Sequence, residues 1–238
     1  MKWVSDKTDR FPKRPHYLPE ELDSECEATL TNFLKDRHGK VDFPISTDDL
    51  TVLLESLVDD LDVFADLSKE TGDVEGVTDF FPSRRSKVRI SQRLSSDPRM
   101  ANRFRTTLTH ELGHVQFHGF MFELGRGGNT LLAPVSVPVS NKCKRDNILH
   151  AGQSDWMEWQ AGYSCGAFLM PLTALREEVR AFIEEKKVSM GKFSLASPLG
   201  QSLLAKACSA FQVSQDAARV RLLQRGFLVE GELSPTLF

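Results

Sequence analysis

A pair of histidines on one predicted helix constrains the fold of this chain more than any other feature. The segment HELGH places His110 and His114 four residues apart, with Glu111 directly after the first histidine. Four residues along a helix correspond to about 400°, so the two imidazoles differ in direction by about 40° and lie one turn apart. Both rings can therefore bind a single metal ion, and histidine nitrogen binds zinc at about 2.0–2.1 Å.

Glu111 belongs beside such an ion and not on it. The same helical geometry rotates its side chain by about 80° from the mean direction of the two histidines. From there its carboxylate can take a proton from a water molecule and deliver it to a leaving amine. The alternative is a surface helix with a stripe of glutamate and histidine, because HExxH occurs by chance in many helices.

The helix that carries the motif has a strong start signal. Asp97 can cap it and Pro98 suits its first turn, so we expect a helix from there to about Gly119. Gly113 lies inside this helix, where glycine is about 1 kcal/mol less favourable than alanine. Close approach of another helix would explain that residue.

A second helix, expected from about Asp155 to Met170, supplies a candidate third ligand, Glu158. Glu158 shares one helical face with positions 161, 162, 165 and 166, which are all small residues. Such a face lets two helices approach closely and would bring the carboxylate to the metal. The alternative is that Glu158 completes a capping box with Asp155, but a cap does not require the small face, so we favour the ligand. Two histidines, one glutamate and a water would leave the open position of a catalytic zinc.

The rest of the sequence predicts an α+β fold with a small antiparallel sheet. Apolar residues recur at helical spacing in two segments before the motif, residues 19–37 and the residues after Thr47. Three strand-like runs follow them, residues 61–67, 74–81 and 87–91. Residues 119–153 are rich in Gly, Pro and Asn and predict a long irregular loop, and two or three helices complete the chain.

Both motif helices resemble one known family, the ImmA/IrrE zinc metallopeptidases. RFRTTLTHELGHVQFH (103–118) and EWQAGYSCGAFLMP (158–171) are similar to the two halves of its pattern, roughly RxxxxHExGHxxLH and ExxANxFAxxLLMP. The segment LLAKACSAFQVSQDAARVRLLQRGFL (203–228) is similar to the helical segment after the peptidase core of this family. The pattern differs at Gly162 and Ser164, where the family usually has Asn and Phe.

The resemblance implies a zincin-like metallopeptidase fold. It implies that His110, His114 and Glu158 bind Zn²⁺ and that Glu111 is the catalytic base. We accordingly expect three parts: an N-terminal arm and helix (1–40), the metallopeptidase domain (41–175) and a helical, helix-turn-helix-like C-terminal extension (176–238).

The resemblance also implies a substrate. Known members are mostly bacterial or encoded by mobile elements, and several cut a helix-turn-helix transcriptional repressor. A repressor encoded nearby is therefore the expected substrate. The alternative is a non-enzymatic regulator that contains structural zinc and binds a repressor, an antitoxin or DNA. For DNA binding, the tail would offer four cations to phosphates: Lys206, Arg219, Arg221 and Arg225.

Other residues near the motif are secondary candidates. His118 continues the histidine stripe, and we expect it to orient a ligand or cap the helix, since a fourth ligand would close the site. His150 and Tyr163 could stabilise an oxyanion, although ordinary packing or exposure explains both. A thiolate of Cys143 could bind the zinc and keep the enzyme latent, and a plain surface cysteine is the alternative.

The strand before the active helix, Lys87 to Ser91, could hold an extended substrate by strand addition. Such a substrate strand would use Lys87, Val88, Arg89 and Ile90. Its charges could attract an acidic segment, or they could simply prevent aggregation of an edge strand.

Composition limits the remaining classes. The chain has 238 residues and a net charge of −3, unlike the basic footprint of a dedicated nucleic-acid binder. Its four cysteines form no CxxC pair, so we expect reduced thiols in the cytoplasm. No run approaches the roughly 18 apolar residues of a membrane span, and the first residues lack the core of a signal peptide. We therefore expect no membrane partner.

Overall fold

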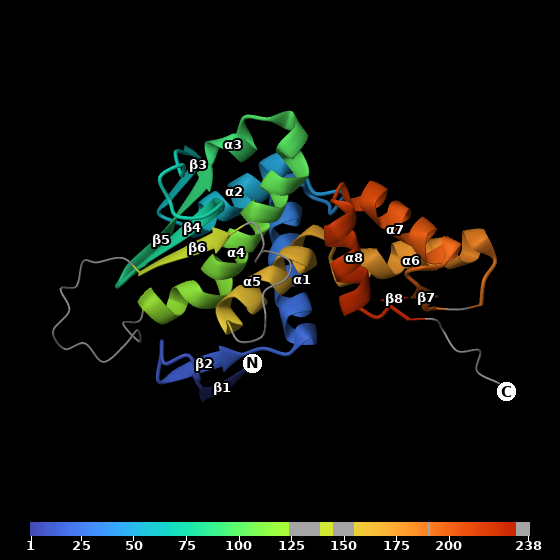
Figure 1. Ribbon diagram of the computed structural model, residues 1–238, viewed down its shortest axis with the longest axis horizontal. Helices are drawn as coiled ribbons and strands as arrows, with labels where there is room; N and C mark the ends of the chain where they lie inside the picture. Colours follow the sequence, from blue (N-terminus) through green and yellow to red (C-terminus); the bar gives the residue numbers. More distant parts are fainter. Residues whose placement is uncertain (124–138, 145–154, 190, 232–238) are drawn as a thin grey trace.

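A four-stranded sheet and the helices packed on it hold the histidine motif (Figure 1). The computed structural model describes residues 1–123, 139–144, 155–189 and 191–231. The strand order in the sheet is β3 (Asp60–Ala65), β5 (Arg84–Ser91), β4 (Val74–Phe81) and β6 (Val139–Lys144). Strand β4 pairs antiparallel with β5 and with β6, whereas β3 runs parallel to β5.

The α+β class is confirmed, and the sheet differs from the prediction in two ways. The parallel pair arises because β4 and β5 form a hairpin and β3 lies next to β5, not next to β4. The predicted loop over 119–153 is shorter at its start and contains a strand, since residues 139–144 pair with β4. Whether the fold is zincin-like stays a prediction.

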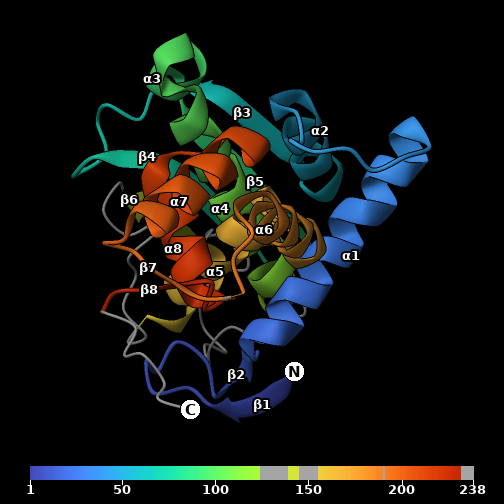
Figure 2. The same cartoon turned by 90° about the vertical axis from the view of Figure 1, so that its right-hand side faces the viewer.

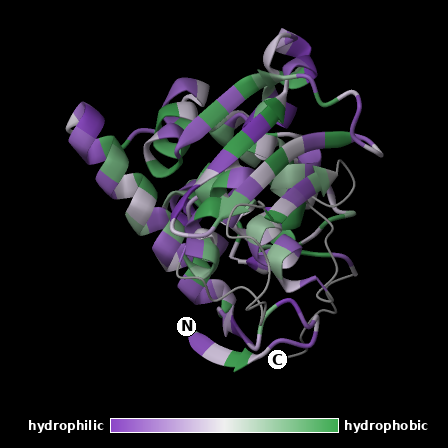
Figure 3. Ribbon diagram, turned by 90° about the vertical axis from the view of Figure 1, so that its left-hand side faces the viewer, coloured by the Kyte–Doolittle hydropathy of each residue, from purple (hydrophilic) through white to green (hydrophobic). Residues whose placement is uncertain are grey.

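One face of the sheet is covered by the long helix α4 (Ala101–Glu123). Polar and apolar residues alternate along the strands (Figure 3), and in β5 Ser86, Val88 and Ile90 are the buried set. The start of α4 is preceded by the short helices α3 (Gln92–Ser95) and η1 (Pro98–Met100). The side chain of Asp97 accepts the backbone N–H of Arg99, as expected of a cap.

Helix α5 (Trp156–Leu169) packs along α4 and is buried over most of its length. The helices meet where Gly113 faces Ala161: a Cβ added to the glycine would lie 3.0 Å from the Ala161 Cα. The glycine therefore permits a helix separation that any larger residue would oppose. This contact is the close approach that the small residues predict.

The N-terminal segment is ordered, although its composition suggests a loose arm. Strands β1 (Lys2–Ser5) and β2 (Lys13–His16) form a hairpin, followed by helices α1 (Pro19–His38) and α2 (Thr47–Leu57). Arg10 forms an ion pair with Asp155, the cap of α5. The hairpin is thus fixed by tertiary contacts with α5 that local composition does not reveal.

The C-terminal segment contains α6 (Leu172–Lys186), β7 (Phe193–Ser194), α7 (Pro198–Phe211), α8 (Gln215–Gln224) and β8 (Leu228–Val229). Of its helices, α8 packs on α5, and α7 packs between α8 and α6 (Figure 2). The segment shares the core of the rest of the chain, since Leu22 of α1, Leu108 of α4 and Leu222 of α8 belong to one buried cluster. Among all the helices in the described ranges, none combines the length and the apolarity that crossing a membrane requires.

Candidate metal centre

Three side chains from α4 and α5 converge in the interior. The Nε2 atoms of His110 and His114 lie 3.1 Å apart. The Glu158 carboxylate places one oxygen 3.3 Å from the first nitrogen and the other 3.2 Å from the second. Both histidines are fully buried and Glu158 nearly so. His110, His114 and Glu158, called the metal group below, can hold a metal ion.

The distances between neighbouring donor atoms are close to those between two ligands of a tetrahedral ion. Metal–ligand bonds of about 2.0–2.1 Å, as zinc forms with nitrogen and oxygen, separate two ligands by about 3.3 Å. The two histidine nitrogens are 3.1 Å apart, and each Glu158 oxygen lies near a different one of them, at 3.3 Å from His110 Nε2 and 3.2 Å from His114 Nε2. Within the described residues, the Oε2 atom of Glu158 is buried and forms no hydrogen bond. A cation among the three donors would supply the missing partner.

The charges in this group stabilise one another. Burial raises the pKa of Glu158, but the imidazoles of His114 and His110 lower it more, so this pKa lies well below its usual range. Burial lowers the pKa of His114, but the Glu158 carboxylate raises it more, so this pKa lies above its usual value. Glu158 is therefore a carboxylate and not a neutral acid.

Glu111 lies beside the three donors, as its place in the motif predicts. The Thr78 hydroxyl of β4 donates a hydrogen bond to its Oε2 atom. Its Oε1 atom is buried and has no hydrogen-bond partner among the described residues. A Cβ added to Gly76 would lie 2.2 Å from this Oε1 atom, so glycine at position 76 leaves the space that the carboxylate fills. Burial raises the pKa of Glu111 although both histidines oppose the shift, which suits a group that accepts and returns a proton.

Glu158 serves the helix and the metal group with different atoms. The Asp155 side chain accepts the backbone N–H of Glu158 and so caps α5. The carboxylate of Glu158 points to the histidines instead of completing a capping box. Ala161, which touches Gly113, follows one turn later, so the helix contact also positions this carboxylate.

A chain of hydrogen bonds leads from the N-terminal hairpin to His114. The Gln160 Nε2 donates to the carbonyl of Pro15, so its Oε1 is left to accept from His118 Nε2 at 3.0 Å. Burial, together with His114, holds the pKa of His118 well below its usual value, so this ring is neutral. Its Nδ1, 3.1 Å from His114 Nδ1, then accepts a hydrogen bond from that nitrogen, and the His114 Nε2 keeps a lone pair that a metal ion could use. His118 is placed to orient a ligand.

Two secondary candidates lie elsewhere. The Tyr163 hydroxyl donates to Asp23 and accepts from Arg225, so it is occupied on the side of α5 that faces α1 and α8. This geometry does not support an oxyanion role. His150 lies outside the described residues.

The predicted substrate strand is corrected. Lys87, Val88, Arg89 and Ile90 belong to β5, which has β3 on one side and β4 on the other. Its backbone hydrogen bonds are used on both edges, so it cannot accept another strand. Exposed charges are typical of edge strands, so the sequence of β5 resembles one although both of its edges are paired.

Sequence reasoning missed the strand that lies over the metal group. Asn141 of β6 donates from Nδ2 to Glu158 Oε1 at 2.7 Å and lies 3.0 Å from His114 Nε2. Cys143 is buried, and its sulfur lies within 4.8 Å of donor atoms of His110 and Glu111. Burial raises the pKa of this thiol, with Glu111 adding to the shift. The sequence signal for this strand is the alternation of Val139, Asn141 and Cys143 with Ser140, Lys142 and Lys144 in the segment VSNKCK.

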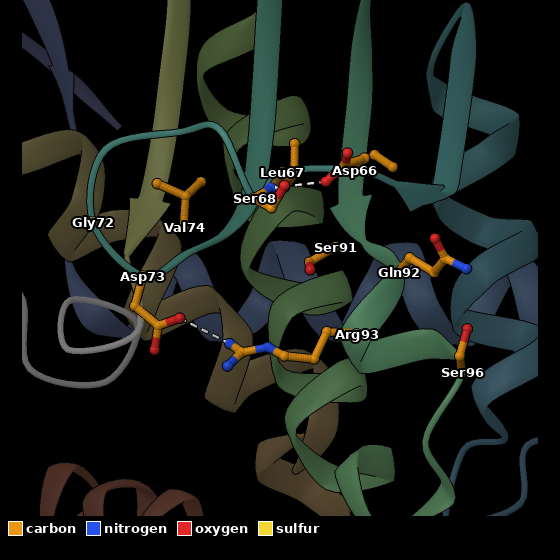
Figure 4. Close-up of a pocket in the computed structure, with 11 residues that line it drawn as sticks. Asp66, Leu67, Ser68, Gly72, Asp73, Val74, Ser91, Gln92, Arg93 and Ser96 are labelled. Carbon is orange, nitrogen blue, oxygen red and sulfur yellow. Dashed lines mark hydrogen bonds and ion pairs between the residues drawn. The ribbon is translucent and has the colours of Figure 1, made fainter.

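A separate pocket of about 560 Å³ lies between the β3–β4 connection and α3 (Figure 4). Asp66, Ser68 and Gln92 are among its lining residues, and Arg93 bonds Asp73 across it. None of the residues of the metal group lines it. Comparison with known proteins adds no assignment for either site: no protein-family model matches the chain, and no curated protein matches it.

Proposed function

We propose that this chain is a zinc-dependent metalloendopeptidase that hydrolyses peptide bonds of a protein substrate. The observation that carries this proposal is the convergence of His110, His114 and Glu158, whose donor atoms lie 3.1–3.3 Å from their neighbours, with the Glu111 carboxylate alongside. Two nitrogens and one carboxylate leave the fourth position open, as in catalytic zinc sites. A structural zinc site would have four protein ligands. It would have no use for a second buried carboxylate beside the ion, such as that of Glu111, with one oxygen free of hydrogen bonds.

A bound zinc ion would polarise the scissile carbonyl and make water a better nucleophile. The residues of the chain supply the proton transfers. Glu111 is held through Oε2 by Thr78, and its Oε1 is free to take a proton from the attacking water. Its raised pKa favours return of that proton to the leaving amine. His118 keeps the His114 ring in the tautomer that binds a metal.

Membership of the ImmA/IrrE family is part of the proposal. It is supported by the pattern of residues 103–118 and 158–171, and by the geometry that those residues adopt. A helix-turn-helix repressor encoded nearby is the substrate that this membership suggests.

DNA binding by the tail is disfavoured. The four tail cations are engaged by acidic side chains, which would have to be replaced by phosphates. These ion pairs are Lys206 with Glu178, Arg219 with Asp216, Arg221 with Asp23 and Arg225 with Asp23. A regulator that binds a repressor or antitoxin without cutting it is the alternative that the test must separate.

Glu111→Gln tests the proposal. The amide preserves shape but cannot accept the proton, so zinc content should stay at one per chain while cleavage falls by about 10²–10⁴-fold. Zinc is measured by elemental mass spectrometry, and cleavage by mass spectrometry of the repressor encoded next to the gene. Glu123→Gln, an exposed residue at the end of the same helix, is the matched control and should retain activity.

Two results would refute the peptidase. Unchanged cleavage by Glu111→Gln would remove the proposed base. Zinc-loaded wild-type protein that binds the repressor but leaves it intact would favour the non-enzymatic regulator.

A further inference from the structure

We propose that β6 is a built-in substrate-like strand that covers the metal centre, and that an extended peptide must replace it beside β4 before cleavage. This inference rests on the proposed peptidase function and adds its regulation. It follows from the register of β6, from the contacts of Asn141 and from the position of β6 at the edge of the sheet.

The register directs alternate residues of β6 toward the metal group. Asn141 lies opposite Thr78, and Cys143 lies opposite Gly76. Both of these β4 residues lie against Glu111: Thr78 donates to its carboxylate, and an added Cβ at Gly76 would collide with it. Directly paired residues of an antiparallel ladder project from the same face. Asn141 and Cys143 therefore face the catalytic base, as side chains of a substrate strand in the same position would.

Asn141 occupies space that a substrate needs. Its amide is within hydrogen-bond distance of Glu158 and of the His114 Nε2 atom, two of the three metal donors. A carbonyl or a water that bound to these two donors would compete with the amide for the same atoms. Cys143 fills the adjacent space near His110 and Glu111. In this arrangement the centre is assembled but covered.

The attachment of β6 suits replacement by another strand. In the described part of the chain β6 has one strand neighbour, β4, and Val139 at its start is 55% exposed. On the face away from the metal, Ser140 donates to Asp79, and Lys142 pairs with Glu70. If β6 leaves, β4 presents a row of free N–H and C=O groups beside the metal. An extended peptide can bind there by strand addition.

A reversible lock tests this inference. Asp79 and Ser140 are partners in the ladder, and paired Cα atoms in such ladders lie about 4.5–5.5 Å apart, within the range for a disulfide. The double variant Asp79→Cys/Ser140→Cys can therefore fix β6 to β4 when oxidised. The same variant under reductant is the matched control.

Two readouts do not require a substrate. The first is alkylation of Cys143 by iodoacetamide, followed by mass spectrometry. The second is the rate at which 1,10-phenanthroline removes zinc. We expect oxidation to slow both by at least about tenfold and to suppress repressor cleavage, with recovery on reduction. Equal rates, or equal cleavage, in the oxidised and reduced forms would overturn the role of β6.

A second variant covers the case in which the double variant does not fold. Asn141→Ala removes the hydrogen bond that fixes β6 to Glu158 and should speed zinc removal by about tenfold. Val139→Ala changes an exposed residue of the same strand and should leave the rate unchanged. Unaltered zinc removal in Asn141→Ala would overturn the inference. A wild-type chain that binds no zinc would instead refute the proposed function, while Cys143 labelling would still measure the opening of β6.

Discussion

We expect alanine to have opposite effects on stability at two glycines of α4, because Gly113 lies at the close contact with α5 and Gly119 does not. Alanine is about 1 kcal/mol more favourable than glycine inside a helix when nothing else changes. At Gly119 an added Cβ would have its nearest neighbours at 3.5 and 3.8 Å, which are ordinary contacts. We therefore expect Gly119→Ala to raise the free energy of unfolding by about 0.5–1 kcal/mol.

At Gly113 the added Cβ would lie 3.0 Å from the Cα and 3.2 Å from the carbonyl oxygen of Ala161. These are backbone atoms of a buried helix, so they cannot move without moving α5. Overpacking of this kind costs about 1–3 kcal/mol, which exceeds the gain in helix propensity. Gly113→Ala should thus lower the free energy of unfolding by up to about 2 kcal/mol, and it should weaken zinc binding because α5 carries Glu158.

Guanidinium unfolding followed by circular dichroism measures both variants, in chelator to remove any contribution of metal. The two variants should differ in stability by about 1–3 kcal/mol, with Gly113→Ala the less stable. Zinc affinity is then measured by competition with a chromogenic chelator. If Gly113→Ala proved as stable as Gly119→Ala and bound zinc as tightly as wild type, the close approach of the two helices would be wrong.

Three further outcomes are expected. Glu158→Gln should lower zinc affinity, measured by chelator competition, by more than about 100-fold. Residues that only orient a ligand typically account for roughly 10–100-fold. A zinc affinity equal to that of the wild type would exclude Glu158 as a ligand. Gly76→Ala should keep zinc but lose cleavage, because its Cβ displaces the Glu111 carboxylate, and full activity would contradict that crowding. Arg221→Met should destabilise the fold by about 3 kcal/mol in chemical denaturation, because it breaks the buried ion pair with the Oδ1 atom of Asp23, while Tyr163 and Arg225 stay on Oδ2. The exposed ion pair of Arg219 gives the control, and Arg219→Met should cost less than about 1 kcal/mol.

The parts of the site that could be predicted from sequence are those that local geometry determines. His110, Glu111 and His114 lie on one helix, so helical periodicity alone sets their relative directions. Glu158 required one further step, the pairing of two helices through small residues. Gly113 and the small face of α5 recorded that pairing in the sequence.

Long-range strand pairing was not predictable in the same way. The apolar pattern of β3 does not say which strand lies next to it, so the parallel pair with β5 was missed. The strand β6 lies within a stretch rich in Gly, Pro and Asn, and its alternation is short. Asn141 reaches the metal group only because β6 pairs with β4, a contact between residues more than 60 positions apart.

Strand β4 links Glu111, the proposed base, to the place where we propose that a substrate binds. Thr78 donates to Glu111 through its side chain, while its backbone lies in the ladder with Asn141. The other edge of β4 stays paired with β5 whether or not β6 is present. Removing β6 therefore need not disturb the hydrogen bond that orients the base. The proposed exchange of β6 is therefore compatible with a fixed Glu111, because Thr78 and Gly76 belong to a strand that does not have to move.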